Sequence, residues 1–273
     1  MDPIAILTVV LGALVGFSLG LTGGGGAIFA VPMLVYVLGV PAREAVGISL
    51  LTVGSTAFVG FVQRARRSMV EFPTGLLFAL AGMIGAPIGS KLADFVPEPL
   101  LLAMFAGLMF LIAIRMWLKA NEKASHLPIL ADDNAGPTCR RDPEGRLRLT
   151  SQCAMLLGIV GLSAGILTGV FGVGGGFIIV PALVSFACMG MQRAIGTSLL
   201  IITLVSLSGT TGHLLAGKEL SLQTSGLFTS GSLIGLFIGS WLAQRLAGPM
   251  LQRLFAISIV LVATYVILRS RSG

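Results

Sequence analysis

Two clusters of contiguous glycines carry the clearest chemistry in this sequence. "GLTGGGGAIFAVP" begins at Gly20 and "GVFGVGGGFIIVP" begins at Gly169, each inside an apolar run. A helix that restarts after such a cluster presents free amide N–H groups and the positive end of its dipole, and glycine lets a ligand approach them closely. The clusters therefore predict a paired anion-binding centre. Its expected residues are Gly23, Gly24, Gly25, Gly26 and Pro32, with Gly172, Gly174, Gly175, Gly176 and Pro181.

The elements that carry these clusters have to break at the glycines. Residues 3–42 and 153–192 contain no charge, and about 40 residues in one helix would measure about 60 Å, twice the hydrocarbon thickness of a bilayer. Glycine in a helix costs about 1 kcal/mol relative to alanine, so the chain can turn there. Pro32 and Pro181 each remove one further amide and kink the following arm. Close helix packing is the alternative interpretation of the clusters.

Other glycines are spaced four residues apart, which is typical of close packing between membrane helices. These sets are Gly12, Gly16 and Gly20; Gly161, Gly165 and Gly169; Gly85 and Gly89; and Gly235 and Gly239.

Hydroxyl side chains form a stripe on one helical face in each half of the chain. The stripes are Ser49, Thr52 and Thr56, and Thr203, Ser206, Thr210 and His213. Such stripes indicate either hydrogen bonds within and between helices or a hydrated path for a substrate. His213 is either structural or couples transport to protons. Arg64, within "QRARR", predicts an interfacial basic loop, with an anion entrance as the alternative.

Several functions are excluded by the residues that are missing. Neither glycine cluster is followed by the Lys of a phosphate-binding loop, and the dinucleotide pattern fails at Phe177. "GLSAG" matches a hydrolase elbow but lies inside an apolar helix, so we expect no enzyme. The spans hold no carboxylate that could bind a metal cation, and the spacing of Cys139, Cys153 and Cys188 supports neither a metal site nor a disulfide framework. We expect no metal and no cofactor.

The composition is that of an integral membrane protein. Of 273 residues 55% are hydrophobic and 11% charged, and the mean hydropathy is +0.97. The net charge of +7 comes from Lys and Arg in short loops, as the positive-inside rule expects, so we expect no nucleic-acid partner. We predict that the N-terminal region is a membrane span and not a cleaved signal peptide. Spanning length is reached at 45–62, 72–90, 194–212 and 220–244, and with flanking basic residues at 99–114 and 254–268.

The chain repeats itself. When Gly23 is aligned with Gly172, "AVPMLV" meets "IVPALV" and "AVGISLL" meets "AIGTSLL". With one residue of slip, "GAPIGSKLA" meets "GLFIGSWLA". We therefore predict an all-α polytopic fold with a first membrane repeat at 1–118, a polar linker at 119–149 and a second repeat at 150–273. Duplicated membrane repeats around a central site are typical of transporters.

These motifs together resemble the TauE/SafE sulfite exporter family, also called toluene-sulfonate uptake permeases. The resemblance covers both halves and rests on "GGGGAIFAVP" and "GVGGGFIIVP", on "AVGISLL" and "AIGTSLL", and on two G-x-x-x-G-S motifs. It implies a plasma-membrane permease of two four-span repeats that moves sulfite, sulfoacetate or another organic anion. It also implies roles for Ser49, Thr197 and Ser198 beside the glycines and prolines.

We therefore expect a multi-pass permease of the cell membrane that moves a small anion by alternating access around the two glycine breaks. The substrate would be held by backbone amides and by the hydroxyls of Ser49, Thr197 and Ser198. The alternative is a membrane scaffold or sensor that transports nothing. If each glycine-broken run returns to its starting side the repeats are inverted, and if it crosses once they are parallel. Both arrangements place the linker and "RARR" on the Lys- and Arg-rich side, which we expect to be cytoplasmic.

Overall fold

The computed structural model describes residues 3–24, 26–97, 151–172, 174–187, 189–216 and 221–243, together with 100, 104 and 107. Within these residues the chain forms helices and no strand, which confirms the all-α prediction. The helices are α1 (Pro3–Thr22), α2 (Ala27–Tyr36), α3 (Ala42–Ala65), α4 (Phe72–Asp94), α6 (Ser151–Phe171), α7 (Gly176–Phe186), α8 (Met191–Leu215) and α9 (Leu222–Ala243). The predicted linker lies outside the described residues.

Six of these helices are long and apolar enough to cross a membrane: α1, α3, α4, α6, α8 and α9. They include the four uninterrupted spans expected from the sequence. The two shorter spans expected at 99–114 and 254–268 lie outside the described residues, apart from three positions in the first of them. The helices α2 and α7 have 10 and 11 residues, about 15 Å, which is too short to cross a bilayer.

Each glycine-broken run folds back on itself. The backbone of Gly26, at the start of α2, lies against Val15 and Leu19 of α1, and a Cβ on Gly26 would collide with both. In the second half, a Cβ on Gly175 would lie 2.5 Å from Oγ1 of Thr168 in α6. Each pair, α1 with α2 and α6 with α7, is therefore a hairpin of one long and one short helix.

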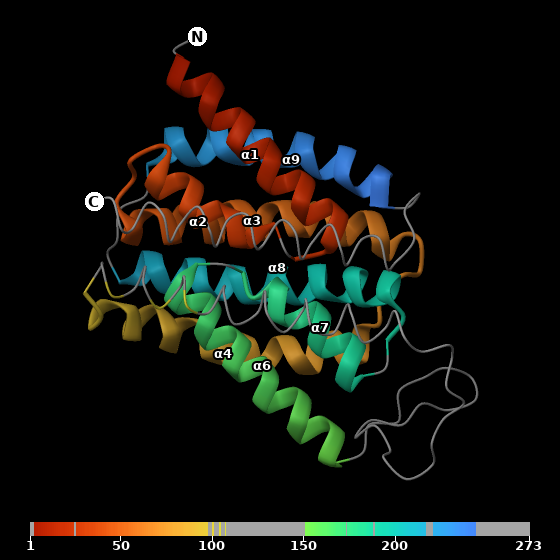
Figure 1. Ribbon diagram of the computed structural model, residues 1–273. Helices are drawn as coiled ribbons and strands as arrows, with labels where there is room; N and C mark the ends of the chain where they lie inside the picture. The colour runs from red at the N-terminus through yellow and green to blue at the C-terminus, as the bar shows by residue number, and fades with distance from the viewer. Residues whose placement is uncertain are drawn as a thin grey trace.

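The long helices pair across the two halves of the chain (Figure 1). Helix α1 packs on α9, and α6 packs on α4, on opposite sides of the central pair α3 and α8. Both outer pairs are parallel: Gly12 meets Phe228 and Gly16 meets Ser232, while Gly165 meets Gly82. At these contacts the missing side chain allows the backbones to touch, as the spacing of the glycines predicts.

The central helices α3 and α8 run in opposite directions. Gly54 lies against Ser206, Gly60 lies against Leu199, and the end of α3 reaches the start of α8. These two helices are also the most enclosed, with 61% and 72% of their spanning windows buried against 39–44% in the other four. Because equivalent spans cross in opposite directions, the hairpins they follow enter from opposite sides.

One cysteine corrects the sequence analysis. Cys153 in α6 is disulfide-bonded, although the cysteine spacing predicted no disulfide framework. The other two cysteines, Cys139 and Cys188, lie outside the described residues. Whether two cysteines bond depends on how far apart the fold places them, which their spacing in the sequence does not give.

Candidate functional site

The two glycine turns meet at the centre of the molecule. A Cβ on Gly24 would lie 2.5 Å from the Cα of Gly176, and a Cβ on Gly176 would collide with Gly24 in return. Gly23 and Gly172 adopt φ values of 73° and 68°, a region that side chains disfavour, and this ends α1 and α6. The clusters, far apart in the sequence, thus bring two helix starts to one place. Gly25 lies outside the described residues.

Two serines tie each turn to the opposite half of the chain. The hydroxyl of Ser49 in α3 donates to the carbonyl oxygen of Gly172 at 2.6 Å. The hydroxyl of Ser198 in α8 donates to the carbonyl oxygen of Gly23 at 2.5 Å, and also approaches the carbonyl of Ile195 at 2.8 Å. Both serines are fully buried. We call these two reciprocal bonds the serine latches, because each joins a span of one half to the turn of the other.

The short helices begin beside this contact. The N-cap residues of α2 and α7 are Gly26 and Gly175, and neither supplies a side-chain cap. The amides of Gly23 and Gly172 are used within their own helix ends, donating to Leu19 and Thr168 at 2.8 Å each. Helix starts leave their first amides without an intrahelical acceptor, and they carry a partial positive charge. The centre therefore combines two positive helix ends.

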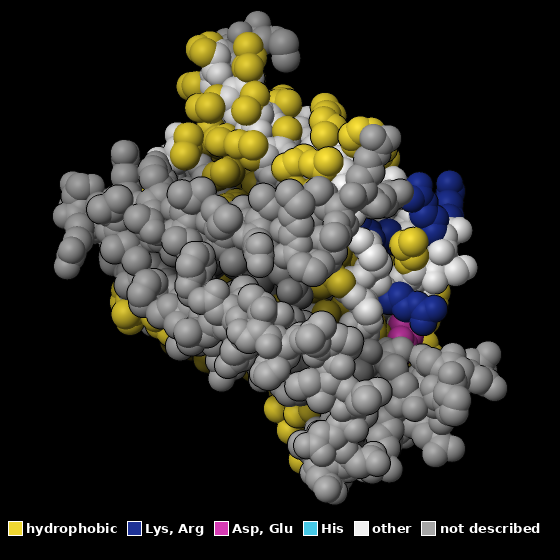
Figure 2. Space-filling model, turned by 45° about the vertical axis from the view of Figure 1, so that its right-hand side comes forward, with side chains coloured by type: hydrophobic (Ala, Val, Ile, Leu, Met, Phe, Trp, Pro, Cys, Tyr) yellow, Lys and Arg dark blue, Asp and Glu magenta, His cyan; other side chains and the backbone are white. Residues whose placement is uncertain are grey.

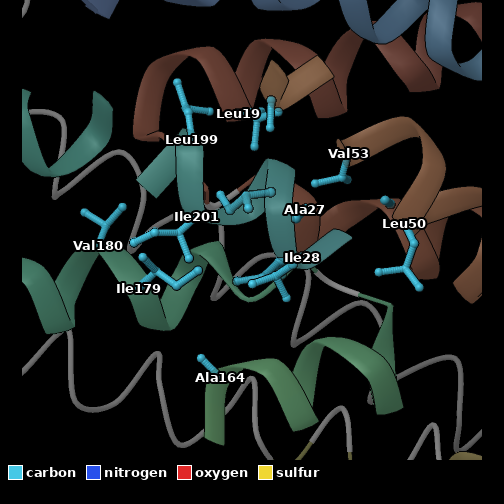
Figure 3. Close-up of a cluster of buried hydrophobic side chains, with 14 of the residues drawn as sticks. Leu19, Ala27, Ile28, Leu50, Val53, Ala164, Ile179, Val180, Leu199 and Ile201 are labelled. Carbon is cyan, nitrogen blue, oxygen red and sulfur yellow. The ribbon is translucent and has the colours of Figure 1, made fainter. Parts of the chain in front are cut away.

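Buried aliphatic side chains from α1, α2, α3, α6, α7 and α8 form a cluster in the helices that flank the glycine turns (Figure 3). Ile202 would lie 2.6 Å from a Cβ on Gly176, and Val53 would lie 2.8 Å from a Cβ on Gly174. Ala27, Ile28 and Leu199 are also buried there. The two turns touch directly, so their contact leaves no space for a ligand between Gly24 and Gly176.

The two prolines lie within the short helices and do not end them. Pro32 is buried in α2, which continues to Tyr36, and Pro181 lies in α7, which continues to Phe186. Because proline has no N–H, the carbonyl of Ile28 loses its helical donor at Pro32. The prolines loosen the hydrogen bonding of each arm close to the site.

Thr197 is turned toward another element. Its Oγ1 accepts a hydrogen bond of 3.0 Å from the amide of Glu71, immediately before α4, and Glu71 in turn accepts from Thr74 at 2.6 Å. The neighbouring Gly196 lies against the backbone of Met69. Thr197 thus caps the start of α4, whereas Ser198, one residue further, reaches a glycine turn.

The hydroxyl stripes differ between the two halves. Thr52 pairs with Thr229 at 2.9 Å, and Thr56 donates to Ser232 at 3.0 Å, so the first stripe bonds α3 to α9. On α8, Thr203 bonds its own backbone at Leu199. The remaining stripe members on α8 are all buried, namely Ser206, Thr210 and His213. The hydroxyls of Ser206 and Thr210 have no hydrogen-bond partner in the described part of the chain.

The prediction of a basic loop is wrong for Arg64. This residue lies inside α3, is 4% exposed, and donates from Nη1 to Oε1 of Gln192 at 3.1 Å. Arg66 and Arg67, which follow it, are exposed as expected. The sequence analysis missed Gln192 because a glutamine at the end of an uncharged run has no distinctive pattern. The only signal was the alignment of Arg64 with His213, which is also buried at the end of its span.

Relatives of this chain are membrane proteins. It matches the family described as Sulfite exporter TauE/SafE over residues 8–266. A "Probable membrane transporter protein" of Xylella fastidiosa (strain 9a5c) is 34% identical over 97% of this chain and 95% of its own length. The "Probable membrane transporter protein YdhB" of Bacillus subtilis (strain 168) is 28% identical over 78% of this chain and 80% of its own length. No solved structure matches the chain.

The family match covers nearly the whole chain. The chain is therefore a multi-pass membrane protein that belongs to the TauE/SafE sulfite exporter family of membrane transporters.

Proposed function

We propose that this protein moves a small anion, sulfite or an organosulfonate, across the cell membrane by alternating access around the two glycine turns. The observation that carries the proposal is the meeting of Gly24 and Gly176 at the starts of two short helices that enter from opposite sides. Two positive helix ends at one point favour an anion over a cation. The substrate class follows the name of the family.

Separation of the two halves is the step that opens the site. Both serine latches cross between halves, since Ser49 holds Gly172 and Ser198 holds Gly23. When the halves move apart these bonds break, and each hydroxyl becomes free to donate to the anion in place of a carbonyl oxygen. The glycine amides and the hydroxyls then replace part of the hydration shell that the anion loses. Inverted halves give two equivalent ways of opening, one to each side of the membrane.

Charge favours the same substrate class. The described parts of the six spans place no carboxylate beside the glycine turns, and Glu44 and Glu71 lie at span ends. A cation in the membrane interior would need such a group as a partner. The positive-inside rule further places the end of α3 and the predicted linker in the cytoplasm. His213, which is buried near the end of α8, could also couple transport to protons. The flux assay with and without a pH gradient, described next, examines this coupling.

Flux through reconstituted vesicles tests the proposal. The purified protein is expected to move sulfite or methanesulfonate faster than acetate, and the assay is run with and without a pH gradient. Gly24→Ala places a methyl group against Gly176 and is expected to lower flux about ten-fold or more, because the turns can no longer close. Gly226→Ala in α9 is the matched control, since nothing lies within 4 Å of its new methyl group.

Equal flux in the two alanine variants, or a wild-type protein that moves none of these anions, would contradict the proposal. Size-exclusion profiles in detergent verify that both variants are folded. If Gly24→Ala does not fold, Ser198→Ala replaces it, because this variant removes a hydroxyl at the site without adding volume.

A further inference from the structure

Arg64 is a buried cation that has no counter-ion among the residues that the structure describes. Its side chain is 4% exposed, and Nη1 donates to Oε1 of Gln192 at 3.1 Å. Nη2 is buried and has no hydrogen-bond partner in the described part of the chain, where Arg64 also forms no ion pair. Taking a charge out of water without a partner is costly, so such a group is retained where it has a task. A guanidinium with an unused donor is suited to a planar or tetrahedral oxyanion.

The partner of Arg64 stands in the first turn of a long helix. Gln192 is the second residue of α8, whose N-cap Gly190 provides no side-chain cap. The helix start therefore adds its own positive end to the charge of Arg64. The side-chain Nε2 of Gln192 donates to the carbonyl oxygen of Ala243, at the end of α9, at 3.4 Å. Three helix ends, those of α3, α8 and α9, thus meet at this point.

More positive charge surrounds the same end of the molecule. Arg66 and Arg67 follow Arg64, Arg193 follows Gln192, and all three are exposed. Figure 2 shows Lys and Arg side chains gathered on the right-hand side, with an acidic side chain beside them, whereas the other described side chains in this view are mostly hydrophobic. An exposed basic group attracts anions from solution and raises their concentration near the buried guanidinium.

A polar face of α3 leads from this end toward the glycine turns. Ser49, Thr52, Thr56, Gly60 and Arg64 follow one another at intervals of three or four residues, which places them on one side of the helix. Thr52 and Thr56 are hydrogen-bonded across to α9, and Ser49 is part of a serine latch.

The equivalent face of α8 is apolar between its own latch and its end. It carries Ile201, Val205 and Gly209 between Ser198 and His213. The positions of this polar face are therefore apolar in α8, whose buried hydroxyls Ser206 and Thr210 stand at other positions of the helix.

We propose that Arg64 and Gln192, at the start of α8, form an oxyanion-binding site at the mouth of the transport path. In the closed protein the side-chain oxygen of Gln192 holds the guanidinium in place of the anion. An arriving sulfonate, sulfite or carboxylate displaces this oxygen and is held by both Nη atoms. The passage of that anion on to the glycine turns rests on the proposed function, whereas its binding at Arg64 does not.

Binding and transport are measured separately to test this site. Calorimetry with methanesulfonate on the purified protein reports binding, and vesicle flux reports the anion concentration for half-maximal transport. Arg64→Gln is expected to weaken both about ten-fold or more. Arg64→Lys keeps the positive charge but loses the two Nη donors of the guanidinium, and is expected to weaken them less. Lys91→Gln, an equal charge change at an exposed residue in the last turn of α4, is expected to leave both unchanged.

Gln192→Glu separates a binding role from a structural one. This variant keeps the size of the side chain and its bond to Nη1, but gives Arg64 a permanent counter-ion. If Arg64 only supports the fold, the variant transports normally and melts at the same temperature or higher. If Arg64 binds the anion, the carboxylate competes with it, and half-maximal transport again needs about ten times more anion. The variant also serves when Arg64→Gln does not fold.

The outcomes separate this site from the proposed function. Binding that depends on Arg64, in a protein that moves no anion, supports the site and overturns the transport proposal. If Arg64→Gln and Gln192→Glu both reach half-maximal flux at the same anion concentration as the wild-type protein, the site is overturned and the transport proposal stands. Absence of methanesulfonate binding by the wild-type protein also overturns the site.

Discussion

Two contacts occupy equivalent places in the two halves and are built differently. Helix α3 is joined to α9 by hydrogen bonds between side chains, Thr52 with Thr229 and Thr56 with Ser232. Helix α8 is joined to α4 by apolar packing, with Val205 against Gly82, and by a hydrogen bond of 2.7 Å from the hydroxyl of Ser208 to the carbonyl oxygen of Met83. The backbones follow the same arrangement in both contacts. The two contacts therefore differ in kind, because the first has hydrogen bonds between side chains and the second combines apolar packing with a hydrogen bond to a backbone carbonyl.

The centre of the molecule shows the opposite behaviour. Ser49 and Ser198 make the same bond to equivalent glycines, and Val46 and Ile195 pack on those glycines in the same way. Symmetry is thus kept where the two turns meet and lost along the paths that lead away from them. Under the proposed alternating access, equivalent latches at the centre would let the protein open to either side, whereas its two mouths would face different solutions.

The largest effect is expected from overpacking the apolar contact. Gly82→Ala would place a methyl group 2.6 Å from Cγ2 of Val205 and 3.3 Å from the carbonyl oxygen of Gly161. Because backbone and side chain both oppose it, we expect a loss of about 2 kcal/mol in stability, read as a lower melting temperature in detergent. Gly158→Ala on α6, where nothing lies within 4 Å, is the control. Equal melting temperatures would show that this contact is loose.

A smaller effect is expected from removing either serine latch. Ser49→Ala and Ser198→Ala each lose one buried hydrogen bond across the halves, which contributes about 1 kcal/mol. Because the latches are equivalent, the two variants should lower the melting temperature by similar amounts. Losses that differ by more than a factor of about two would show that the centre is not symmetric.

The smallest effect is expected from exchanging polar and apolar residues between the two contacts. Thr56→Val loses its bond to Ser232 and is expected to cost about 0.6 kcal/mol, near the average for membrane helices. Val205→Thr is expected to be nearly neutral, because a threonine on α8 can bond its own backbone as Thr203 does. Thermal melting of both variants checks this. A strong loss of stability in Val205→Thr, with none in Thr56→Val, would contradict this order of effects.

Much of this protein follows from local properties of its sequence. Long uncharged runs in a membrane must be helical because the bilayer offers no partner for backbone groups, and a run of twice the membrane thickness must break. Glycines spaced by four residues predicted the close contacts of α1 with α9 and of α6 with α4. The clusters at Gly23 and Gly172 predicted the turns, because few other residues tolerate that backbone conformation.

What the sequence could not supply is which parts lie opposite one another. Only the packed helices bring Gly24 to Gly176, point Ser198 at a turn and Thr197 at α4, and bury Arg64 against Gln192. Neighbours such as Thr197 and Ser198 face different directions because successive residues of a helix are about 100° apart. The sequence by itself determined where the chain is helical and where it breaks, since these depend on composition over a few turns. The tertiary structure decided the partners, because a contact depends on helices far apart in the chain.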